Sequence, residues 1–287
     1  MIKRILRAGI NYPIRQYRRR TASSTILESH SSAIVKGIGV ALRETLRDTA
    51  IQRERDCWRL IEERRCSLSR SRKSIRTLDY GAGQAGSRRT KAEMEHGVEL
   101  TARVSSICRA SKPAFWARFL FKLIRNLRPS SCLELGSCVG KSAAYQAAAL
   151  QLNGRGTLVT IEGAPAIAEI AQETVNHLRL DNVRVIAGPF RTTLCDAMAA
   201  TRPIDFFFND GHHDGDAVIA YFNQAFPSLS RQSTIVFDDI SWSPSMRAAW
   251  NKIEMDERVS TTIDFDAMGI AVINKDATAK DRFRIPL

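Results

Sequence analysis

The chain has 287 residues, of which 44% are hydrophobic and 25% charged, and its net charge is +13. This length and composition suit one large α/β domain with an appendage. The sequence contains no uncharged apolar run of the roughly 18 to 20 residues that a membrane span requires, so we expect a soluble protein.

The positive charge is confined to the N-terminal part. Residues 1–112 contain 25 Lys+Arg and 11 Asp+Glu, whereas the remaining residues contain 18 and 19. Such a segment can bind nucleic acid, an anionic membrane surface or an acidic partner, although a solvated arm is the commoner explanation. The first 27 residues carry seven Lys+Arg and no acid, which is compatible with a transit peptide or a membrane-surface arm, and the sequence favours neither. We interpret residues 1–40 as a basic, poorly ordered extension.

Residues 41–112 form the second predicted region, a mixture of helices and loops that is a candidate lid. Apolar residues have a loosely helical spacing over 40–68, a polar glycine-rich loop follows over 69–90, and we expect another helix over 91–108. The loop segment Gly81-Ala-Gly-Gln-Ala-Gly86 matches G-x-G-x-x-G, but the preceding residues do not have the pattern of a strand and no second strand with a terminal acid follows. We therefore interpret this segment as a flexible loop.

The third region, residues 113–287, has a regular alternation of elements. A helix begins near Pro113, with Ser111 as its cap, and carries apolar side chains at positions 116, 119, 120, 123, 124 and 127. Predicted strands follow over 132–135, 157–161, 183–186, 204–208 and 233–237, and the predicted helices between and after them cover 141–152, 166–178, 192–199, 215–229 and 244–253.

Five short apolar strands separated by helices indicate a parallel sheet that is covered on both faces. Residues 259–265 and 268–274 are joined by a turn too short for a parallel crossover, so they must form an antiparallel hairpin at the sheet edge. The predicted fold class is α/β, a doubly wound, mostly parallel, seven-stranded Rossmann-like sheet with an N-terminal helical extension.

In a doubly wound sheet a ligand lies across the carboxyl ends of the strands. The first strand is followed by a turn whose glycines allow close approach to a helix N-terminus. The second ends in an acid suited to the hydroxyls of a ribose, and the third is followed by a small residue and an aromatic one. These candidate ligand-binding residues are Glu134, Gly136, Ser137 and Gly140, then Glu162, then Gly188 and Phe190.

At this point the sequence resembles the class I S-adenosylmethionine-dependent methyltransferases, and within them the small-molecule O-methyltransferases related to catechol O-methyltransferase. The resemblance covers about residues 113–275 and rests on LELGSCVGKSAAY, VTIEG, VIAGPF, FFFNDGHHDGDAV and IVFDDISWSPSMRAAW. It implies that Glu134 faces the amino group of the methionine moiety, with Gly136, Ser137 and Ser142 around its carboxylate. Glu162 would take the ribose and Phe190 would lie near the adenine.

The acceptor side of such an enzyme needs a base or a metal. Asp210 follows the fourth predicted strand, and Asp238 and Asp239 follow the fifth. Three carboxylates suit Mg²⁺ or another divalent cation, and the resemblance places these residues at the metal ligands of metal-dependent relatives. The alternatives are that Asp210 contacts the sulfonium region of the cofactor and that the other two acids cap a turn.

His213 lies where the same relatives carry a catalytic lysine or histidine, so it is the candidate general base, with His212 as a metal or substrate contact. Trp242 is a candidate for the acceptor pocket, whereas Met246 and Trp250 have the spacing of a buried helix face. Where relatives often have an aromatic residue, this chain has Gly215.

The sequence thus predicts a methyltransferase that uses S-adenosylmethionine, most readily an O-methyltransferase of a small-molecule hydroxyl. The alternatives are a nucleic-acid methyltransferase that uses the basic N-terminal region and a non-catalytic homologue that retains cofactor binding. Six cysteines without Cys-x-x-Cys spacing predict a reduced, cytoplasmic protein. The expected partner is a small-molecule acceptor, nucleic acid is less favoured, and a homodimer is an open alternative.

Overall fold

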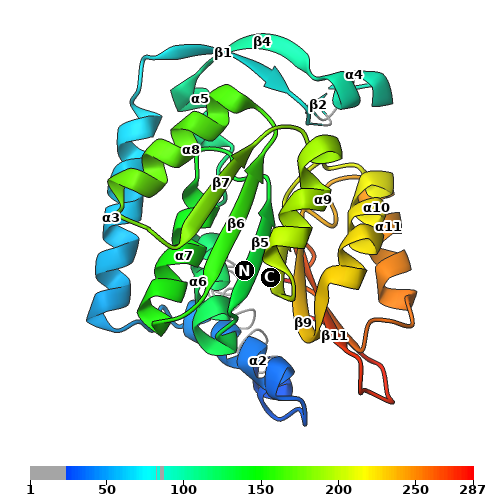
Figure 1. Ribbon diagram of the computed structural model, residues 1–287. Helices are drawn as coiled ribbons and strands as arrows, with labels where there is room; N and C mark the ends of the chain where they lie inside the picture. Colours follow the sequence, from blue (N-terminus) through cyan, green and yellow to red (C-terminus); the bar gives the residue numbers. More distant parts are fainter. Residues whose placement is uncertain (1–23, 82, 85–86) are drawn as a thin grey trace, which may run out of the picture.

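The computed structural model describes residues 24–81, 83–84 and 87–287. Its centre is an eight-stranded sheet in the order β12-β10-β11-β9-β8-β5-β6-β7 (Figure 1). Neighbours from β9 to β7 pair in parallel, whereas β11 pairs antiparallel with both β9 and β10. The strands are β5 (Ser131–Leu135), β6 (Thr157–Glu162), β7 (Val183–Ala187), β8 (Ile204–Asn209), β9 (Leu229–Asp238), β10 (Thr261–Asp264), β11 (Met268–Asn274) and β12 (Asp281–Arg284).

Both faces of the sheet are covered, and the strand period of two explains how one apolar run serves both. Phe206 and Phe208 belong to the core on one face, whereas Phe207 belongs to the core on the other. The first face is covered by α6 (Ala114–Leu127), α7 (Lys141–Asn153) and α8 (Pro165–His177), and the second by α9 (Phe190–Thr201), α10 (Gly215–Ala225) and α11 (Pro244–Met255). This confirms the prediction of a doubly wound, mostly parallel sheet.

Three predicted details of this region are corrected. The described sheet has eight strands, because the polar segment Asp281–Arg284 adds β12 in parallel beside β10. The C-terminal hairpin exists, but β12 pairs with β10 on the outer side, so the hairpin is not the edge of the sheet. The helix expected over 215–229 ends at Ala225, because a short 3₁₀ turn containing Pro227 precedes β9. In addition, the N-cap of α6 is Pro113 rather than Ser111.

The N-terminal helices begin earlier than the sequence suggested. Residues 24–28 are helical and α2 covers Ala33–Leu46, where an irregular extension was expected through residue 40. The reason is packing, since Val35, Ile38 and Leu42 are fully buried in the core that α6 lines. Their spacing of three and four residues is that of a helix face, but Gly37 and Gly39 between them weaken the helix signal in the sequence. Residues 1–23 lie outside the described part.

The region expected to be a loop and a helix forms a small β ribbon instead. Strand β1 (Ser74–Asp79) pairs antiparallel with β4 (Val98–Arg103), and both lie over the carboxyl ends of β5, β6 and β7 (Figure 1). Two short helices flank β4, namely α4 (Lys91–His96) and α5 (Val104–Arg109). A short pair, β2 (Gly83–Gln84) and β3 (Ser87–Arg88), belongs to the predicted glycine loop. Residues 82, 85 and 86 of that loop lie outside the described part.

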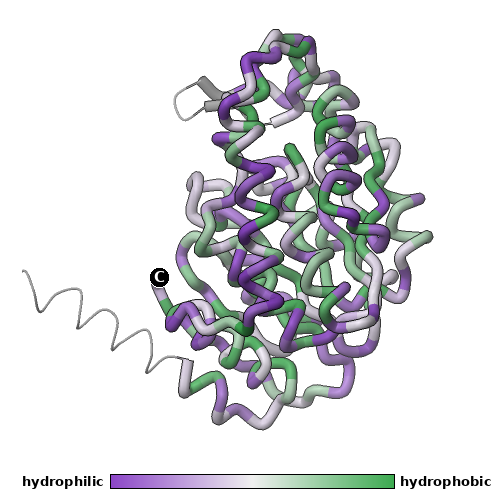
Figure 2. The backbone as a smooth tube through the Cα atoms, turned by 90° about the vertical axis from the view of Figure 1, so that its left-hand side faces the viewer, coloured by the Kyte–Doolittle hydropathy of each residue, from purple (hydrophilic) through white to green (hydrophobic). Residues whose placement is uncertain are grey.

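Helix α3 (Gln52–Ser69) lies at the left in Figure 1 and faces the viewer in Figure 2, where most of it is hydrophilic. Its few buried side chains, among them Trp58 and Ile61, contact the core, so it is a half-exposed cover rather than a core helix. None of the helices in the described ranges is both long and apolar enough to cross a membrane.

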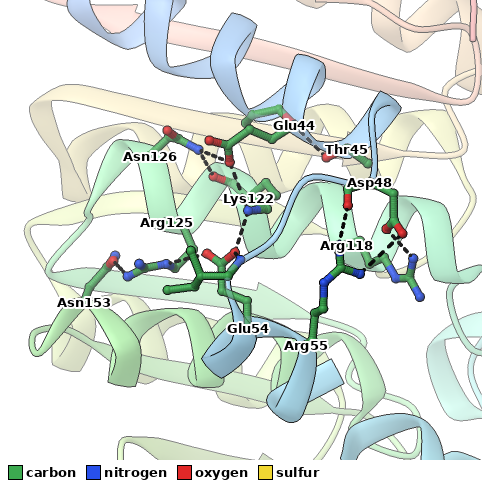
Figure 3. Close-up of polar contacts among 12 residues, drawn as sticks. Glu44, Thr45, Asp48, Glu54, Arg55, Arg118, Lys122, Arg125, Asn126 and Asn153 are labelled. Atoms are coloured by element: carbon green, nitrogen blue, oxygen red, sulfur yellow. Dashed lines mark hydrogen bonds and ion pairs between the residues drawn. The ribbon is translucent and has the colours of Figure 1, made fainter. Parts of the chain in front are cut away.

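A buried network of charges fixes α2 and α3 to the core helices (Figure 3). The Lys122 ammonium on α6 lies 2.7 Å from a Glu54 carboxylate oxygen of α3 and 3.0 Å from Glu44 of α2. Arg125 donates a second hydrogen bond to Glu54 at 3.0 Å. Burial alone would raise the pKa of Glu54, but these hydrogen bonds outweigh burial and lower the pKa below its usual value. Each buried charge is therefore compensated by the others.

Glu54→Gln should destabilise the fold by about 3 kcal/mol, because it leaves the buried Lys122 without a full countercharge. Since the pKa of Glu54 is lowered on folding, its contribution is present above its ordinary pKa of 4.5 and is lost as the pH falls further. Denaturant unfolding at pH 7 and pH 4 measures both effects. Glu63→Gln, at an exposed ion pair with Arg59, should change stability by less than about 1 kcal/mol. Equal losses for the two variants would contradict the role of the network.

Candidate active site

The carboxyl ends of β5, β6 and β8 and the β1–β4 ribbon enclose a cavity of about 830 Å³. This volume is in the range of small-molecule sites. Of the predicted ligand-binding residues, Gly136, Glu162, Phe190 and Asp210 line it. The ribbon region adds apolar side chains that no motif predicted, including Leu78, Met94, Leu100 and Ile107.

The turn after β5 can only be built with glycine at its first position. Gly136 has a φ of +89°, and a Cβ there would lie 2.5 Å from the carbonyl oxygen of Asp210. The two strand ends are joined here, because the Asp210 amide donates to the carbonyl of Leu135 at 3.0 Å. Gly140 has a φ of +83° and approaches Ala171 of α8. The Ser137 hydroxyl in this turn is buried and has no hydrogen-bond partner among the described residues, and Ser137 does not line the cavity.

Glu134 lies on β5 beneath that turn and is fully buried. It accepts hydrogen bonds from Gln146 at 2.8 Å and from Thr160 at 2.6 Å. Burial raises its pKa to about 7, although these bonds and one from Ser142 oppose the shift. Four further predicted ligand-binding residues do not line the cavity in the described structure, namely Glu134, Gly140, Ser142 and Gly188. A buried carboxylate of this kind is well placed to be stabilised by a cationic ligand.

Glu162 ends β6 and lines the cavity. Its two carboxylate oxygens accept hydrogen bonds from the backbone amides of Cys138 at 2.8 Å and Ala164 at 3.1 Å. Burial raises its pKa to about 7, and the nearby carboxylates of Asp79 and Asp210 add to the rise. Each oxygen keeps a free lone pair. Glu162 therefore holds the β5–α7 turn in place and can also accept hydrogen bonds from hydroxyl groups of a ligand.

One wall of the cavity is aromatic and consists of Phe190, His212 and Tyr221. The ring of Phe190 makes edge contacts with His212, at 5.4 Å between centroids, and with Tyr221, at 5.5 Å. A Cβ on Gly211 would lie 2.4 Å from the Phe190 ring, so the glycine makes room for it. His212 bonds the Tyr221 hydroxyl through Nδ1 at 2.5 Å. This contact turns His212 toward the aromatic wall, whereas its neighbour His213 faces the acidic residues.

The three acidic residues contact two basic side chains, His213 and Lys112. His213 Nε2 lies 3.2 Å from an Asp239 oxygen and 3.7 Å from Asp210. Lys112, which no motif indicated, forms an ion pair with Asp238 and has its ammonium 3.4 Å from Asp210. Burial raises the pKa of Asp210, while Lys112 and His213 oppose the rise. Asp239 has a φ of +51°.

The predicted cation site is only partly assembled. Among the described residues, one ligand atom each from Asp210, His213 and Asp238 lies within 4.8 Å of the others. Asp239, the third predicted metal ligand, is not in this group and faces His213 instead. The ammonium of Lys112 lies between two of the three groups. The donor set has suitable chemistry for a divalent cation, but the ammonium of Lys112 already lies against its two carboxylates.

Polar contacts attach the β1–β4 ribbon to the rest of the site. The Lys91 ammonium of α4 lies 2.9 Å from Asp216 of α10, and Arg191 of α9 donates to the carbonyl of Glu95. At its other end the ribbon continues into α5, whose Val104 packs with Val139 of the β5–α7 turn. The ribbon therefore closes the cavity from above, as a lid would. A lid formed by the predicted glycine loop stays a prediction, because that loop is described only in part.

Residues 133–240 match the model of a family described as a methyltransferase domain. These residues form a methyltransferase domain. A catechol O-methyltransferase of Niastella koreensis is 31% identical over 147 residues, 49% of this chain and 64% of the relative. Among solved structures, cofactor-bound Rv0187 from MTB has a TM-score of 0.52 and 24% identity over 58% of this chain and 84% of its own. The Bacillus cereus O-methyltransferase in complex with SAH has a TM-score of 0.50 and 22% identity over 60% and 86%.

The identities to these two structures are below a quarter, so they establish the shared fold, and the chain spans less than two thirds of the N. koreensis protein. The fold places the β5–α7 turn, the end of β6 and the end of β8 around one cavity, as the sequence of the methyltransferase domain predicts. Its acceptor-side chemistry has to be argued from this chain's own side chains.

Other predicted features of the methyltransferase domain have structural explanations. Met246 and Trp250 are buried on α11, as predicted. A Cβ on Gly215 would lie 2.3 Å from the Ser245 carbonyl oxygen, so the start of α10 needs a glycine to approach α11. Trp242 is partly exposed, and its ring lies 5.5 Å from that of His213. Both line a small cavity of about 40 Å³ that shares Met94 with the large one.

Gly136→Ala should destabilise the methyltransferase domain much more than Gly154→Ala. Both glycines have positive φ, so both variants incur a cost of about 1–2 kcal/mol from the left-handed backbone. Only at Gly136 would the new Cβ also overlap backbone atoms, whereas nothing lies within 4 Å at Gly154. Urea unfolding of the two variants measures the difference. Equal stabilities would show that the close approach to Asp210 is not tight.

Proposed function

We propose that this chain is an S-adenosylmethionine-dependent methyltransferase that methylates a hydroxyl group of a small molecule. The observation that carries the proposal is a glycine turn and an acid at a strand end that line a single cavity of the methyltransferase domain, with a second, fully buried acid on the strand before that turn. The relative from N. koreensis is named for catechol O-methylation, which supports a hydroxyl acceptor.

The residues present fit the methyl donor. Glu134 would stabilise the ammonium of its methionine moiety, and the unpaired Ser137 hydroxyl, with Ser142, would serve the carboxylate. Glu162 would accept the ribose hydroxyls, and Phe190 belongs to the aromatic wall on the adenine side. S-adenosylmethionine supplies a methyl group activated by a positively charged sulfur.

The chain's own task is to orient the acceptor hydroxyl and remove its proton. In the net reaction an O–CH₃ bond forms, the S–CH₃ bond breaks with its electrons left on sulfur, and one proton is released. His213 is the proposed base. Because its Nε2 lies 3.2 Å from an Asp239 oxygen, that carboxylate would orient the ring, and Nδ1 would take the proton. Trp242 and Met94 beside His213 would hold the acceptor.

A nucleic-acid acceptor is the second candidate, because of the excess of basic residues before residue 113. In the described part, however, several of these arginines pair with acids, including Arg55 with Asp48 and Arg76 with Glu99. Such pairs reduce the charge available for phosphates. A small-molecule acceptor is therefore the better proposal, while a cytoplasmic location and a homodimer stay predictions.

Glu162→Gln should weaken binding of S-adenosylhomocysteine by about tenfold or more, because hydrogen bonds to a charged group contribute roughly 1.5–3 kcal/mol. Isothermal titration calorimetry measures this, with thermal unfolding as a check that the variant is folded. Glu63→Gln, on the exposed face of α3, is the matched control and should bind as the unmodified protein does. A folded, unmodified protein that does not bind S-adenosylhomocysteine would refute the proposed function.

Binding of S-adenosylhomocysteine should strengthen as the pH rises through about 7, since the pKa of Glu134 is raised to about 7 and only the ionised carboxylate attracts the ligand ammonium. Glu134→Gln should therefore bind about tenfold more weakly than the unmodified protein at pH 8 and almost equally at pH 6. Calorimetry at the two pH values tests this. A deficit of the same size at both would mean that Glu134 acts only as a structural anchor.

His213→Gln should lower turnover about 100-fold or more while leaving S-adenosylhomocysteine affinity unchanged, because a positioned base contributes about 10²–10⁴ in rate. The assay is transfer of labelled methyl groups to an acceptor identified by screening hydroxyl compounds. His177→Gln, at an exposed position on α8, is the control. Unchanged turnover in His213→Gln would remove the residue from the mechanism.

A further inference from the structure

We propose that the ammonium group of Lys112 is the resident cation of the acidic cluster, in the place that the sequence predicted for a divalent metal. The assignment of the cation site rests on the contacts of Lys112 alone. Its consequence for catalysis, methyl transfer without a divalent cation, rests on the proposed function.

The position of the ammonium is the first argument. Lys112 is ion-paired with Asp238, its Nζ lies 3.4 Å from an Asp210 oxygen, and its side chain is 9% exposed. Mg²⁺ binds oxygen ligands at about 2.0–2.1 Å and Ca²⁺ at about 2.3–2.6 Å. A cation that used both aspartates would therefore need the space in which Nζ lies.

Charge balance is the second argument. Two buried carboxylates this close would repel each other without a cation, and a buried ammonium without a carboxylate would be equally costly. Lys112 offsets one of the two negative charges and has both carboxylates as partners, and the ring of Phe208 lies 5.9 Å from the ammonium as a further favourable contact. A divalent cation could enter only by displacing Lys112 from its buried partners, and this competition should reduce the affinity for metal strongly.

The fold holds Lys112 in place, which is the third argument. The residue is followed by Pro113, the N-cap of α6, and preceded by Ser111, whose amide donates to the carbonyl of Cys108 at 3.1 Å. Helix α6 is in turn fixed through Lys122 to the buried Glu54. The lysine therefore projects from a short connection between two anchored helices, so its ammonium has a defined position.

Lys112 is then a positioning residue. Its charge fixes the side chains of Asp210 and Asp238 at the ends of β8 and β9. His213, which lies 3.2 Å from Asp239 and 3.7 Å from Asp210, remains for the proton of the acceptor. The division explains why Asp239 stands apart from the other two acids. The same arrangement gives a role to Lys112, which lies outside the sequence motifs quoted for the methyltransferase resemblance.

The test is Mn²⁺ binding to the full chain, measured by the electron paramagnetic resonance signal of free Mn²⁺ at pH 7.5. The unmodified protein should show no site filled at about 1 mM Mn²⁺. Lys112→Met, which is one atom shorter and removes the charge, should bind Mn²⁺ at least about tenfold more tightly. The double variant Lys112→Met/Asp238→Asn should lose that gain.

Two results would overturn the proposal. One is Mn²⁺ binding to the unmodified protein that Asp238→Asn abolishes, and this measurement does not depend on whether Lys112→Met folds. The other is a folded Lys112→Met that gains no Mn²⁺ affinity. Lys112→Arg retains a positive charge and should stay as unresponsive to Mn²⁺ as the unmodified protein.

The catalytic consequence is measured separately from the cation site. With an acceptor in hand, turnover by the unmodified protein should be unchanged in EDTA, whereas Lys112→Met should lose activity in EDTA and regain part of it with Mn²⁺. Turnover by the unmodified protein that EDTA abolishes would overturn this catalytic consequence. Failure to bind S-adenosylhomocysteine would refute the proposed function while leaving the Mn²⁺ result to decide the role of Lys112.

Discussion

The close approach of Gly136 to the backbone of Asp210 is the constraint on which the site depends. It joins the ends of β5 and β8, so that the turn before α7 and Asp210 border one cavity. A side chain at this position would separate the two strand ends. Glu162 completes the arrangement from β6, because its carboxylate holds the amide of Cys138 in the same turn. The glycine therefore determines where the other functional side chains meet.

Buried charges in this protein occur in compensated groups, and each group has a different task. Glu54, Lys122 and Arg125 attach the N-terminal helices to α6. Lys112 forms an ion pair with Asp238 and lies near Asp210 at the carboxyl ends of β9 and β8. Glu134 differs, because it has hydrogen bonds but no cation, and its raised pKa reflects that lack. A cationic ligand would form an ion pair with such an uncompensated acid. The compensated acids already have a cationic partner within the protein.

The methyltransferase domain was predictable because its strands and helices are encoded locally. Phe206, Phe207 and Phe208 form a continuous apolar run that only a strand buried on both faces accommodates. The β1–β4 ribbon was missed because each strand has only six residues and pairs across an interval of about 20 residues. The alternation of Val98, Leu100 and Ala102 with polar residues was the local signal for β4. The start of α2 was missed because Gly37 and Gly39 weaken the local helix signal around Val35 and Ile38, whose burial depends on α6.

The sequence by itself determined the order of the elements, the glycine turn and the acids at the strand ends, because each depends on residues that are neighbours in the chain. Only the tertiary structure decided which of these acids share a cation and which face a histidine. Lys112 lies about 100 residues from Asp210 and Asp238 in the chain, and no local pattern relates them. Their contact exists because a connection before α6 passes over the carboxyl ends of β8 and β9, and that path is a property of packing.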